Sequence, residues 1–164
     1  MEMNTVLDMI NWKAAAHRQC MPNAQFIFNE WLLKHGEMFG PPIKKPKGVR
    51  LGPMKQCYSN SLKALFMMVD PAEWFYCEGV VFRKDLPIEI DHAWLANRKG
   101  EVLDLTLRNP DSEDQYFGIP YKFDYARDKT FKHGYYGLHS NGMAYNQDVI
   151  ESVEEGRAWP KGEQ

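Results

Sequence analysis

The sequence predicts a single α+β domain spanning residues 1–164. Two segments within residues 3–36 and a third beginning near Cys57 show the apolar spacing of amphipathic helices. Three runs rich in aromatic and β-branched residues follow, at 73–82, 88–96 and 101–107, and are typical of strands. The chain shows no internal repeat and no boundary of a second domain. We therefore expect helices packed on an antiparallel sheet, with the core of the domain at about residues 50–107.

Composition and charge narrow the possible functions. The chain is 44% hydrophobic, 13% aromatic and 26% charged, which is a globular composition. Lys and Arg number 20 against 22 Asp and Glu, and the formal charge of −2 gives no field that would attract nucleic acid or an anionic membrane. No apolar run approaches the roughly 20 residues of a membrane span, so we expect no membrane anchor and no signal peptide. An odd number of cysteines, three, indicates free thiols in a reducing compartment, which favours a cytoplasmic location.

The part of the chain before Cys57 is expected to form two helices and a long connection. One helix covers residues 3–19, with Asn4 or Thr5 able to cap it, and the other covers 23–34 and ends at Gly36. The connection at 40–53 holds four prolines and three glycines, which no regular element would accept. Its basic residues suit a phosphate, an acidic partner or a solvated loop equally well: Lys44, Lys45, Lys47 and Arg50.

The remaining elements follow from Cys57 onward. A helix opens beside Cys57 and is closed before Pro71, and the three strand candidates come next. Residues 108–145 are dense in Tyr, Gly, Asp and Asn, and we expect irregular chain that covers a sheet edge or a cleft. A short helix at about 146–155 completes the C-terminal part, and residues after Trp159 are expected to fray.

The register of one hairpin decides whether His92 and Asp104 can meet. A two-residue loop would place them on opposite faces of the strand pair. The sequence NRKG at 97–100 instead suits a type I turn followed by Gly100 in a left-handed conformation, which forms a bulge. His92 and Asp104 are then diagonal neighbours on one face, where a carboxylate can orient an imidazole. This register pairs Asn97 with Glu101, Trp94 with Asp104 and His92 with Thr106.

A histidine held by a carboxylate needs a nucleophile to complete a catalytic site, and Cys57 is the candidate. It lies at the expected first turn of a helix, where unpaired N–H groups and the helix dipole favour a thiolate. Cys77 lies within an apolar strand candidate and Cys20 between two helices, so both are expected to be buried, inert thiols.

The ordered set formed by Cys57, the HAW sequence at His92 and the DLT sequence at Asp104 resembles the transglutaminase-like branch of the papain-like cysteine enzymes. In that family a cysteine opens a helix packed on an antiparallel sheet, and a strand pair carries HAW-type and DPT-type sequences. Leu105 stands here where the family often has proline. The resemblance covers about residues 50–107 and implies a papain-like/transglutaminase-like fold without a cofactor.

The resemblance implies that Cys57 is the nucleophile, His92 the general base and later acid, and Asp104 the residue that orients His92. An acyl group would pass through a thioester on Cys57 to water, an amine or another acceptor. The Cys57 N–H would stabilise the oxyanion, with Gln56 or Asn60 as candidates for a second donor. Trp94 suits a cleft wall or a core position equally well.

The expected function is hydrolysis of a peptide or isopeptide bond by a cysteine protease-like hydrolase, with transglutaminase or N-acyltransferase activity as alternatives. The substrate would be a protein, a peptide or a small amide or ester. A binding protein that keeps the papain-like scaffold, using the cleft or the aromatic region 116–136, is the alternative from another class. A metal site built from Cys57, Cys77, His92 and Asp104 is disfavoured because close pairs such as C-x-x-C are missing.

Overall fold

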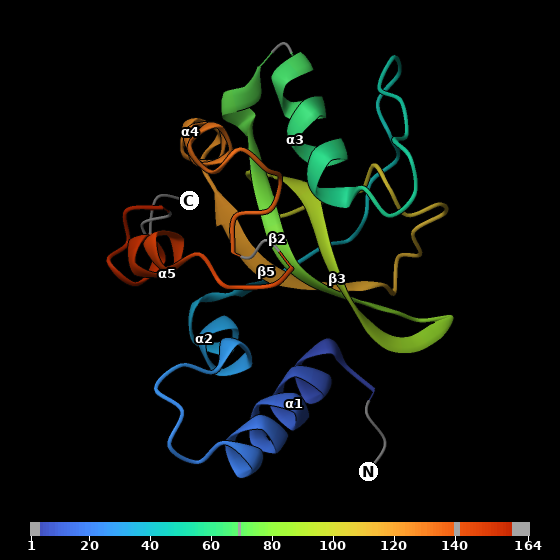
Figure 1. Ribbon diagram of the computed structural model, residues 1–164. Coiled ribbons are helices and arrows are strands. Elements are labelled where there is room, and N and C mark those ends of the chain that lie inside the picture. The colour runs from blue at the N-terminus through green and yellow to red at the C-terminus, as the bar shows by residue number, and fades with distance from the viewer. Residues whose placement is uncertain (1–3, 69, 140–141, 159–164) are drawn as a thin grey trace.

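A computed structural model of the chain describes residues 4–68, 70–139 and 142–158 (Figure 1). Helices lie against a five-stranded antiparallel sheet with the strand order β1-β5-β2-β3-β4. The expected α+β class with an antiparallel sheet is thus confirmed. The described helices are α1 (Val6–Cys20), α2 (Phe28–His35), α3 (Cys57–Met67), α4 (Phe123–His133) and α5 (Gln147–Glu154). The strands are β1 (Glu37–Phe39), β2 (Trp74–Arg83), β3 (Leu86–Asn97), β4 (Val102–Leu103) and β5 (Gln115–Tyr121), and a 3-10 turn at Pro71–Glu73 precedes β2.

The N-terminal helices match their expected places, with one difference. Thr5 caps α1 through a reciprocal pair of hydrogen bonds with Asp8, at 3.1 Å each. Helix α2 begins at Phe28, later than expected, because Ile27 has an extended conformation and the chain before it is irregular. Arg18 of α1 donates its Nε to a Glu30 carboxylate oxygen at 2.9 Å, which ties the two helices together.

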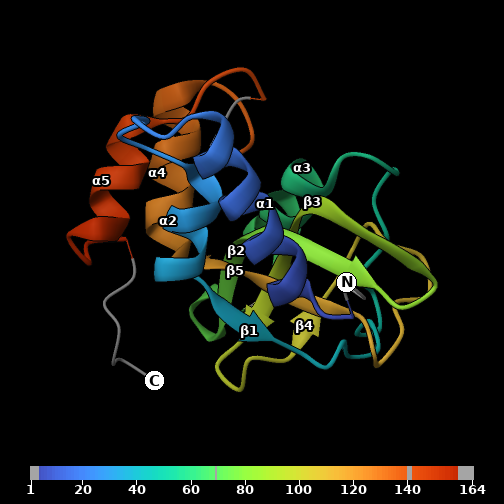
Figure 2. The same ribbon diagram turned by 90° about the horizontal axis from the view of Figure 1, so that it is seen from below.

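The sheet curls until its two edges approach each other. β1 pairs with β5 at one edge, and the chain that leaves β1 then runs beside β4 at the other. Val102 N donates to Pro41 O at 3.1 Å, and Ile43 N donates to Val102 O at 2.7 Å. Figure 2 shows β1 and β4 close together at this side of the molecule. The expected connection at 40–53 is otherwise without regular structure.

The inner face of the curled sheet has its own small core, and Trp94 is at its centre. The Trp94 side chain is fully buried, so of its two expected roles it takes the core position and not that of a cleft wall. Its ring lies over Gly118, where an added Cβ would come within 2.7 Å of Trp94 Cη2. The buried members of this inner core are Phe39, Cys77, Val81, Trp94, Ala96, Val102 and Tyr116.

The outer face of the sheet packs against the helices. Outer residues of β2, β3 and β5 form one continuous core with apolar side chains of all the described α-helices. Burial of this apolar surface is the main source of stability for such a layer, at roughly 25 cal/mol for each Å² removed from water. Its members include Ile10, Leu32, Leu62, Leu65, Val80, Leu95, Ile119, Ala126 and Val149.

A buried carboxylate anchors the C-terminal part of the chain to this face. Glu78 of β2 is 2% exposed and accepts hydrogen bonds from Tyr76 Oη at 2.7 Å, Leu138 N at 2.5 Å and His139 N at 3.0 Å. Burial raises the pKa of Glu78 to about 7, although these donors partly oppose the shift. Leu138 and His139, between α4 and α5, are therefore held directly on the sheet.

The expectation of irregular chain at 108–145 is wrong, because this range contains β5 and α4. β5 lies between β1 and β2 and holds Gly118 and Pro120, two residues that normally argue against a strand. Pro120 is accepted there because β1 pairs only with residues 116–118, so no strand lies beside it on that side. Helix α4 buries only Ala126, which leaves little apolar periodicity to read in its sequence.

The last expected helix is confirmed as α5, with Asn146 at its N-cap and Gly156 in the left-handed region just beyond it. The expectation of fraying after Trp159 lies outside the described residues. Within the described ranges, no helix combines the length and the apolar character needed to cross a membrane.

Candidate active site

The turn that sets the hairpin register has the expected geometry. Gly100 has a φ of 78°, in the left-handed region that glycine adopts without strain. Asn97 N donates to Glu101 O at 3.1 Å and Gly100 N donates to Asn97 O at 2.9 Å. The ladder beyond the turn pairs Ala96 with Val102 and Leu95 with Leu103, which is the expected register.

The second strand of this hairpin is shorter than expected. β4 ends at Leu103, and Asp104 turns the chain away from the sheet. The Asp104 Oδ1 accepts from Thr106 N at 2.8 Å and from Leu107 N at 2.9 Å, a local side-chain-to-backbone pattern that competes with a strand ladder. The expected strand over 101–107, and with it the ladder pair of His92 and Thr106, is therefore not formed.

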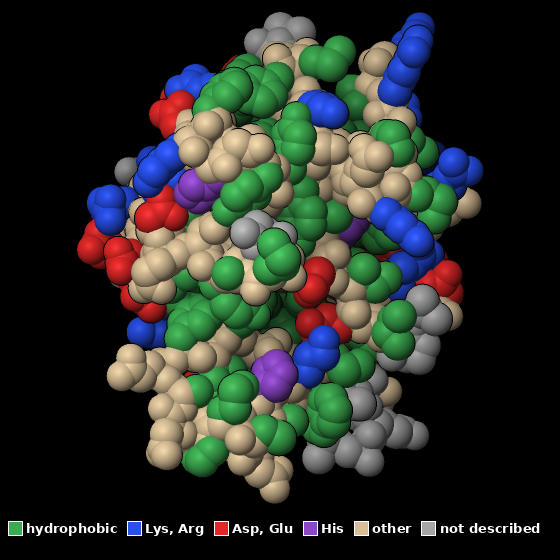
Figure 3. All heavy atoms as spheres, in the orientation of Figure 1, with side chains coloured by type: hydrophobic (Ala, Val, Ile, Leu, Met, Phe, Trp, Pro, Cys, Tyr) green, Lys and Arg blue, Asp and Glu red, His purple; other side chains and the backbone are tan. Residues whose placement is uncertain are grey.

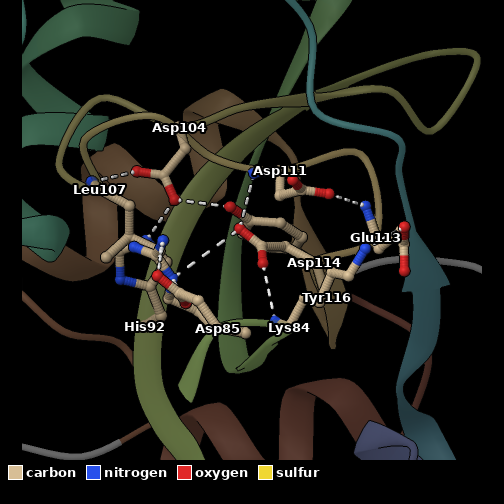
Figure 4. Close-up of polar contacts among 10 residues, drawn as sticks. Lys84, Asp85, His92, Asp104, Leu107, Asp111, Glu113, Asp114 and Tyr116 are labelled. Carbon is tan, nitrogen blue, oxygen red and sulfur yellow. Dashed lines mark hydrogen bonds and ion pairs between the residues drawn. The ribbon is translucent and has the colours of Figure 1, made fainter. Parts of the chain in front are cut away.

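His92 and Asp104 nevertheless meet on the inner face, as the diagonal relationship predicts. His92 Nε2 lies 2.7 Å from Asp104 Oδ2, and the two residues are 2% and 4% exposed (Figure 4). Tyr116 of β5 donates its hydroxyl to the same Asp104 Oδ2 at 2.9 Å. Together with the two backbone donors on Oδ1, these contacts fix the carboxylate from both ends.

Cys57 is the first residue of α3, and its side chain interacts with the His92 imidazole. A side-chain hydrogen bond with Cys57 is among the interactions that raise the pKa of His92. Because Asp104 occupies Nε2, the imidazole nitrogen left for the thiol is Nδ1. Helix α3 reaches this position because it packs on β3, where Ser61 Oγ donates to Ala93 O at 3.1 Å. Cys57 is 7% exposed, so a small part of the residue faces solvent.

The pKa values of His92 and Asp104 are shifted in opposite directions. Burial by itself lowers the pKa of His92, but hydrogen bonds and charge interactions with Asp104 and Cys57 outweigh it and raise the pKa to about 9. Burial favours the neutral form of Asp104, yet the hydrogen bonds from His92 and from the backbone hold the pKa of this carboxyl below its ordinary value. The imidazole is therefore protonated at neutral pH beside an ionised carboxylate.

The two candidates for a second oxyanion donor have different surroundings. Asn60 is 8% exposed, and its Nδ2 donates at 2.8 Å to both Pro53 O and Thr106 Oγ1. Its amide hydrogens are thus occupied in joining α3 to the segments on either side. Gln56 is the exposed N-cap residue of α3, next to Cys57, and its amide remains a candidate.

Two hollows include residues that flank Cys57 in the sequence, Tyr58 in one and Gln56 in the other. The first, of about 670 Å³, is lined by Tyr58, Glu78, Asp91 and side chains of α1 and α2. The second, of about 1070 Å³, lies between residues 46–53 and α3 and is lined by Gln56 and Asn60. Figure 3, drawn in the orientation of Figure 1, shows acidic side chains near the middle of this face of the molecule. Residues 46–53 thus form one wall of the second hollow.

The other cysteines lie apart from this arrangement. Cys77 is fully buried in the inner core, as expected, but Cys20 ends α1 and is exposed, so the expectation of a buried Cys20 is wrong. Its place as the last residue of α1, rather than between packed helices, leaves this thiol in solvent. Among the described residues, no three His, Cys, Asp or Glu side chains are grouped so as to hold a metal, and the four-ligand alternative is not assembled.

Two residues of the site region were missed by sequence reasoning. Tyr116 contacts Asp104 from a strand that was expected to be irregular, and Glu78 lines the first hollow. The run QYFGIPY carries aromatic and β-branched residues and would have indicated a strand if its glycine and proline had been accepted at a sheet edge. No sequence signal separates Glu78 from an ordinary solvent-facing strand residue.

Comparisons of the chain with protein-family models, with curated proteins and with solved structures found no match. The function must therefore be argued from the geometry and chemistry of the site.

Proposed function

We propose that this protein is a cysteine-dependent acyl-transfer enzyme in which Cys57, His92 and Asp104 act as a triad. One observation carries the proposal: the buried His92 imidazole contacts the Asp104 carboxylate at 2.7 Å, and interactions with both Asp104 and Cys57, the first residue of α3, raise its pKa. A nucleophile, a base and an orienting group within hydrogen-bond reach of one another are the elements of nucleophilic catalysis.

The proposed reaction begins with the thiol proton on His92 and a thiolate on Cys57. The sulfur attacks the carbonyl carbon of an amide, and the new oxyanion is stabilised by the Cys57 backbone N–H, which has no intrahelical partner at the first helical position. The C–N bond then breaks, and the imidazolium gives its proton to the departing amine. This leaves a thioester on Cys57 and a neutral His92.

The second half of the reaction restores the enzyme. Neutral His92 takes a proton from water as the water oxygen attacks the thioester carbonyl. The C–S bond breaks, the carboxylic acid departs, and the proton stays on His92 beside the Cys57 thiolate. An amine in place of water would give a new amide, which is the transglutaminase or N-acyltransferase alternative.

Hydrolysis of a peptide or isopeptide bond is the first choice within this class. The two hollows, lined by Tyr58 and by Gln56, the sequence neighbours of Cys57, offer room for a substrate chain near the nucleophile. The walls come in part from irregular segments, and loops of this kind commonly determine specificity. A screen of peptides, isopeptides and small acyl donors would identify the substrate.

The reactivity of Cys57 tests the proposal without knowledge of the substrate. We would label the full-length Cys20→Ser protein with iodoacetamide near neutral pH and follow each thiol by peptide mass spectrometry. Cys20 is removed because it is exposed, and the buried Cys77 serves as an internal reference. We expect Cys57 to react about tenfold faster than an unstructured cysteine peptide.

Matched histidine variants show whether this reactivity depends on the triad. His92→Ala should slow the labelling of Cys57 by about tenfold or more. His133→Ala is the control, because His133 lies on α4 and pairs with Asp148 away from the triad. If Cys57 reacts no faster than Cys77, or if His92→Ala leaves its rate unchanged, the enzyme proposal fails and a binding protein becomes the better interpretation.

A further inference from the structure

The hollow beside Tyr58 lies next to the triad but is made of other residues. Its volume is about 670 Å³, and it lies between α1, α2 and the outer face of β2 and β3. Tyr58 follows Cys57 directly, and Gly79 pairs with His92 across the β2–β3 ladder. The hollow therefore contains the residue that follows Cys57 and borders the strand position paired with His92.

Carboxylates from β3 enter this hollow. Glu89 and Asp91 are two residues apart on one strand and so share its outer face. The Glu89 side chain is 3% exposed, and its Oε1 pairs with Lys13 Nζ at 3.1 Å. Its Oε2 is buried and, in the part of the chain that the structure describes, has no hydrogen-bond partner. A buried carboxylate oxygen without a partner is costly unless a ligand supplies the missing donor.

The charge balance of the hollow is negative. Asp91 is exposed on its wall, and Glu78 lies at its base with a pKa of about 7, raised by burial. Lys13 is the cation that partly offsets these carboxylates, and it is 36% exposed by side chain. The hollow thus holds more negative than positive charge at neutral pH.

Aromatic rings form much of the remaining wall: Trp12, Phe28, Tyr58, Tyr136 and Tyr145. Phe28 and Tyr145 stack at 4.9 Å with an interplanar angle of 11°, which gives the wall a fixed surface. Burial, followed by the nearby Asp91 charge, raises the pKa of Tyr145, so the carboxylate lies close to this ring. Carboxylates beside aromatic faces are the surroundings that organic cations prefer.

We propose that this hollow is a recognition subsite for a guanidinium or ammonium group, carried by a basic side chain of the substrate next to the scissile bond. Glu89 Oε2 and the Asp91 carboxylate would accept the N–H donors, and the aromatic wall would face the cation. A guanidinium fits best, because its planar fork can donate to two acceptors while its face lies on an aromatic ring. The statement that the cation belongs to a substrate rests on the proposed function. The statement that the hollow binds a cation does not.

Direct binding tests the subsite independently of catalysis. We would titrate full-length protein carrying Cys57→Ser with N-acetyl-arginine amide and follow the backbone amide signals by NMR. N-acetyl-citrulline amide is the neutral control of the same shape, and N-acetyl-lysine amide distinguishes the two cations. We expect the arginine probe to bind about tenfold more tightly than the citrulline probe, with shifts at residues 89–91.

Substitutions of residues that line the hollow test whether the arginine probe binds there. Asp91→Asn and Glu89→Gln should each weaken the arginine probe about fivefold or more, and Lys13→Met should strengthen its binding because a competing cation is removed. Asp128→Asn is the matched control, since Asp128 is an exposed carboxylate on α4 that pairs with Arg127. Asp91 is exposed, so its variant should fold even if the Glu89 variant does not.

Equal binding of the arginine and citrulline probes, or no effect of Asp91→Asn, would overturn the subsite. If that result came with a reactive, His92-dependent Cys57, only the subsite would be lost. If the arginine probe bound as expected while Cys57 proved unreactive, the cation site would stand and the catalytic proposal would fall.

Discussion

The Tyr116 hydroxyl and the His92 imidazole share one oxygen of Asp104. Tyr116 Oη lies 2.9 Å and His92 Nε2 lies 2.7 Å from Asp104 Oδ2, while Oδ1 accepts two backbone N–H groups. All four contacts favour the ionised carboxylate, and they come from three separate parts of the chain. Tyr116 of β5 thus helps to hold the carboxylate that contacts His92, which makes Tyr116 a positioning residue.

Tyr116→Phe tests this relationship. The substitution removes one hydrogen bond to a buried, ionised carboxylate and leaves the aromatic ring in the inner core. We expect the free energy of unfolding to fall by about 1.5–3 kcal/mol, measured by chemical denaturation. Because Asp104 would hold His92 less firmly, the labelling rate of Cys57 should also fall, and its pH profile should shift relative to wild type.

Tyr121→Phe is the matched control. Tyr121 is also fully buried in β5, but its hydroxyl has no hydrogen-bond partner among the described residues. Removing that hydroxyl should be neutral or stabilising, and it should leave Cys57 labelling unchanged. Equal losses in the two variants would mean that the Tyr116 contact has no special role.

His92 should titrate far above an ordinary histidine. Its pKa of about 9 means that the imidazolium persists through neutral pH, and an NMR titration of the His92 ring should show this midpoint. In Asp104→Asn the partner charge is lost while burial still disfavours the cation, so the pKa should fall well below 9. A midpoint that does not move in Asp104→Asn would contradict the pairing.

The same pKa predicts how stability depends on pH. The folded pKa of His92 lies above its unfolded value of about 6.5, so the protonated pair stabilises the folded state fully below that pH. This contribution is lost as the pH rises through about 9. Amide hydrolysis should fall in the same range, because His92 can no longer protonate the departing amine.

Glu78 should make the protein less stable as the pH rises from about 4.5 to 7. Burial raises its folded pKa to about 7, so the folded state binds the proton more tightly than the unfolded state does. The loss should be on the order of 3 kcal/mol, since one pKa unit corresponds to about 1.4 kcal/mol. Denaturation of wild type and Glu78→Gln at both ends of this range checks the prediction. Only the wild type should lose this free energy of unfolding between the two pH values. An equal loss in Glu78→Gln would mean that other groups cause it.

Local chemistry explains which parts of the site could be predicted. The hairpin register follows from the turn sequence at 97–100, because Gly100 can take a positive φ and the ladder positions then follow by counting. Cys57 could be placed at the start of α3 because a proline-rich segment ends just before an apolar repeat. Both inferences depend on neighbours in sequence.

The missed features depend on contacts between distant parts of the chain. β5 is a strand because β1 and β2 pair with it, although Gly118 and Pro120 weaken its own preference. Asn60 was one of two candidates for the second oxyanion donor, but its amide joins Pro53 to Thr106, a contact that only the fold creates. A side chain that the sequence suggests as a hydrogen-bond donor to the substrate can thus already be engaged by other residues of the folded protein.

Asn60→Ala separates a structural role from oxyanion stabilisation. The variant removes two hydrogen bonds at 2.8 Å that connect α3 with residues 53 and 106. We expect the free energy of unfolding to fall by about 1–3 kcal/mol and residues 46–53 to become more accessible to proteases. Ser59→Ala, another buried polar residue of the same helix turn, has only a 3.3 Å contact to lose and should cost less. An Asn60→Ala protein of unchanged stability that has lost catalysis would restore the oxyanion role.

Gly100→Ala probes the turn that brings His92 and Asp104 to one face. No atom lies within 4 Å of the position where the new methyl group would be, so any loss comes from the φ of 78° and not from a clash. We expect a loss of about 1 kcal/mol in the free energy of unfolding, and a smaller loss for Gly100→Asn, because asparagine tolerates the left-handed region better than alanine. Gly142→Ala, also at positive φ in open space, should cost a similar amount but leave the His92 titration unchanged. If Gly100→Ala cost nothing and the His92 midpoint stayed at about 9, the bulge would not be what fixes the register.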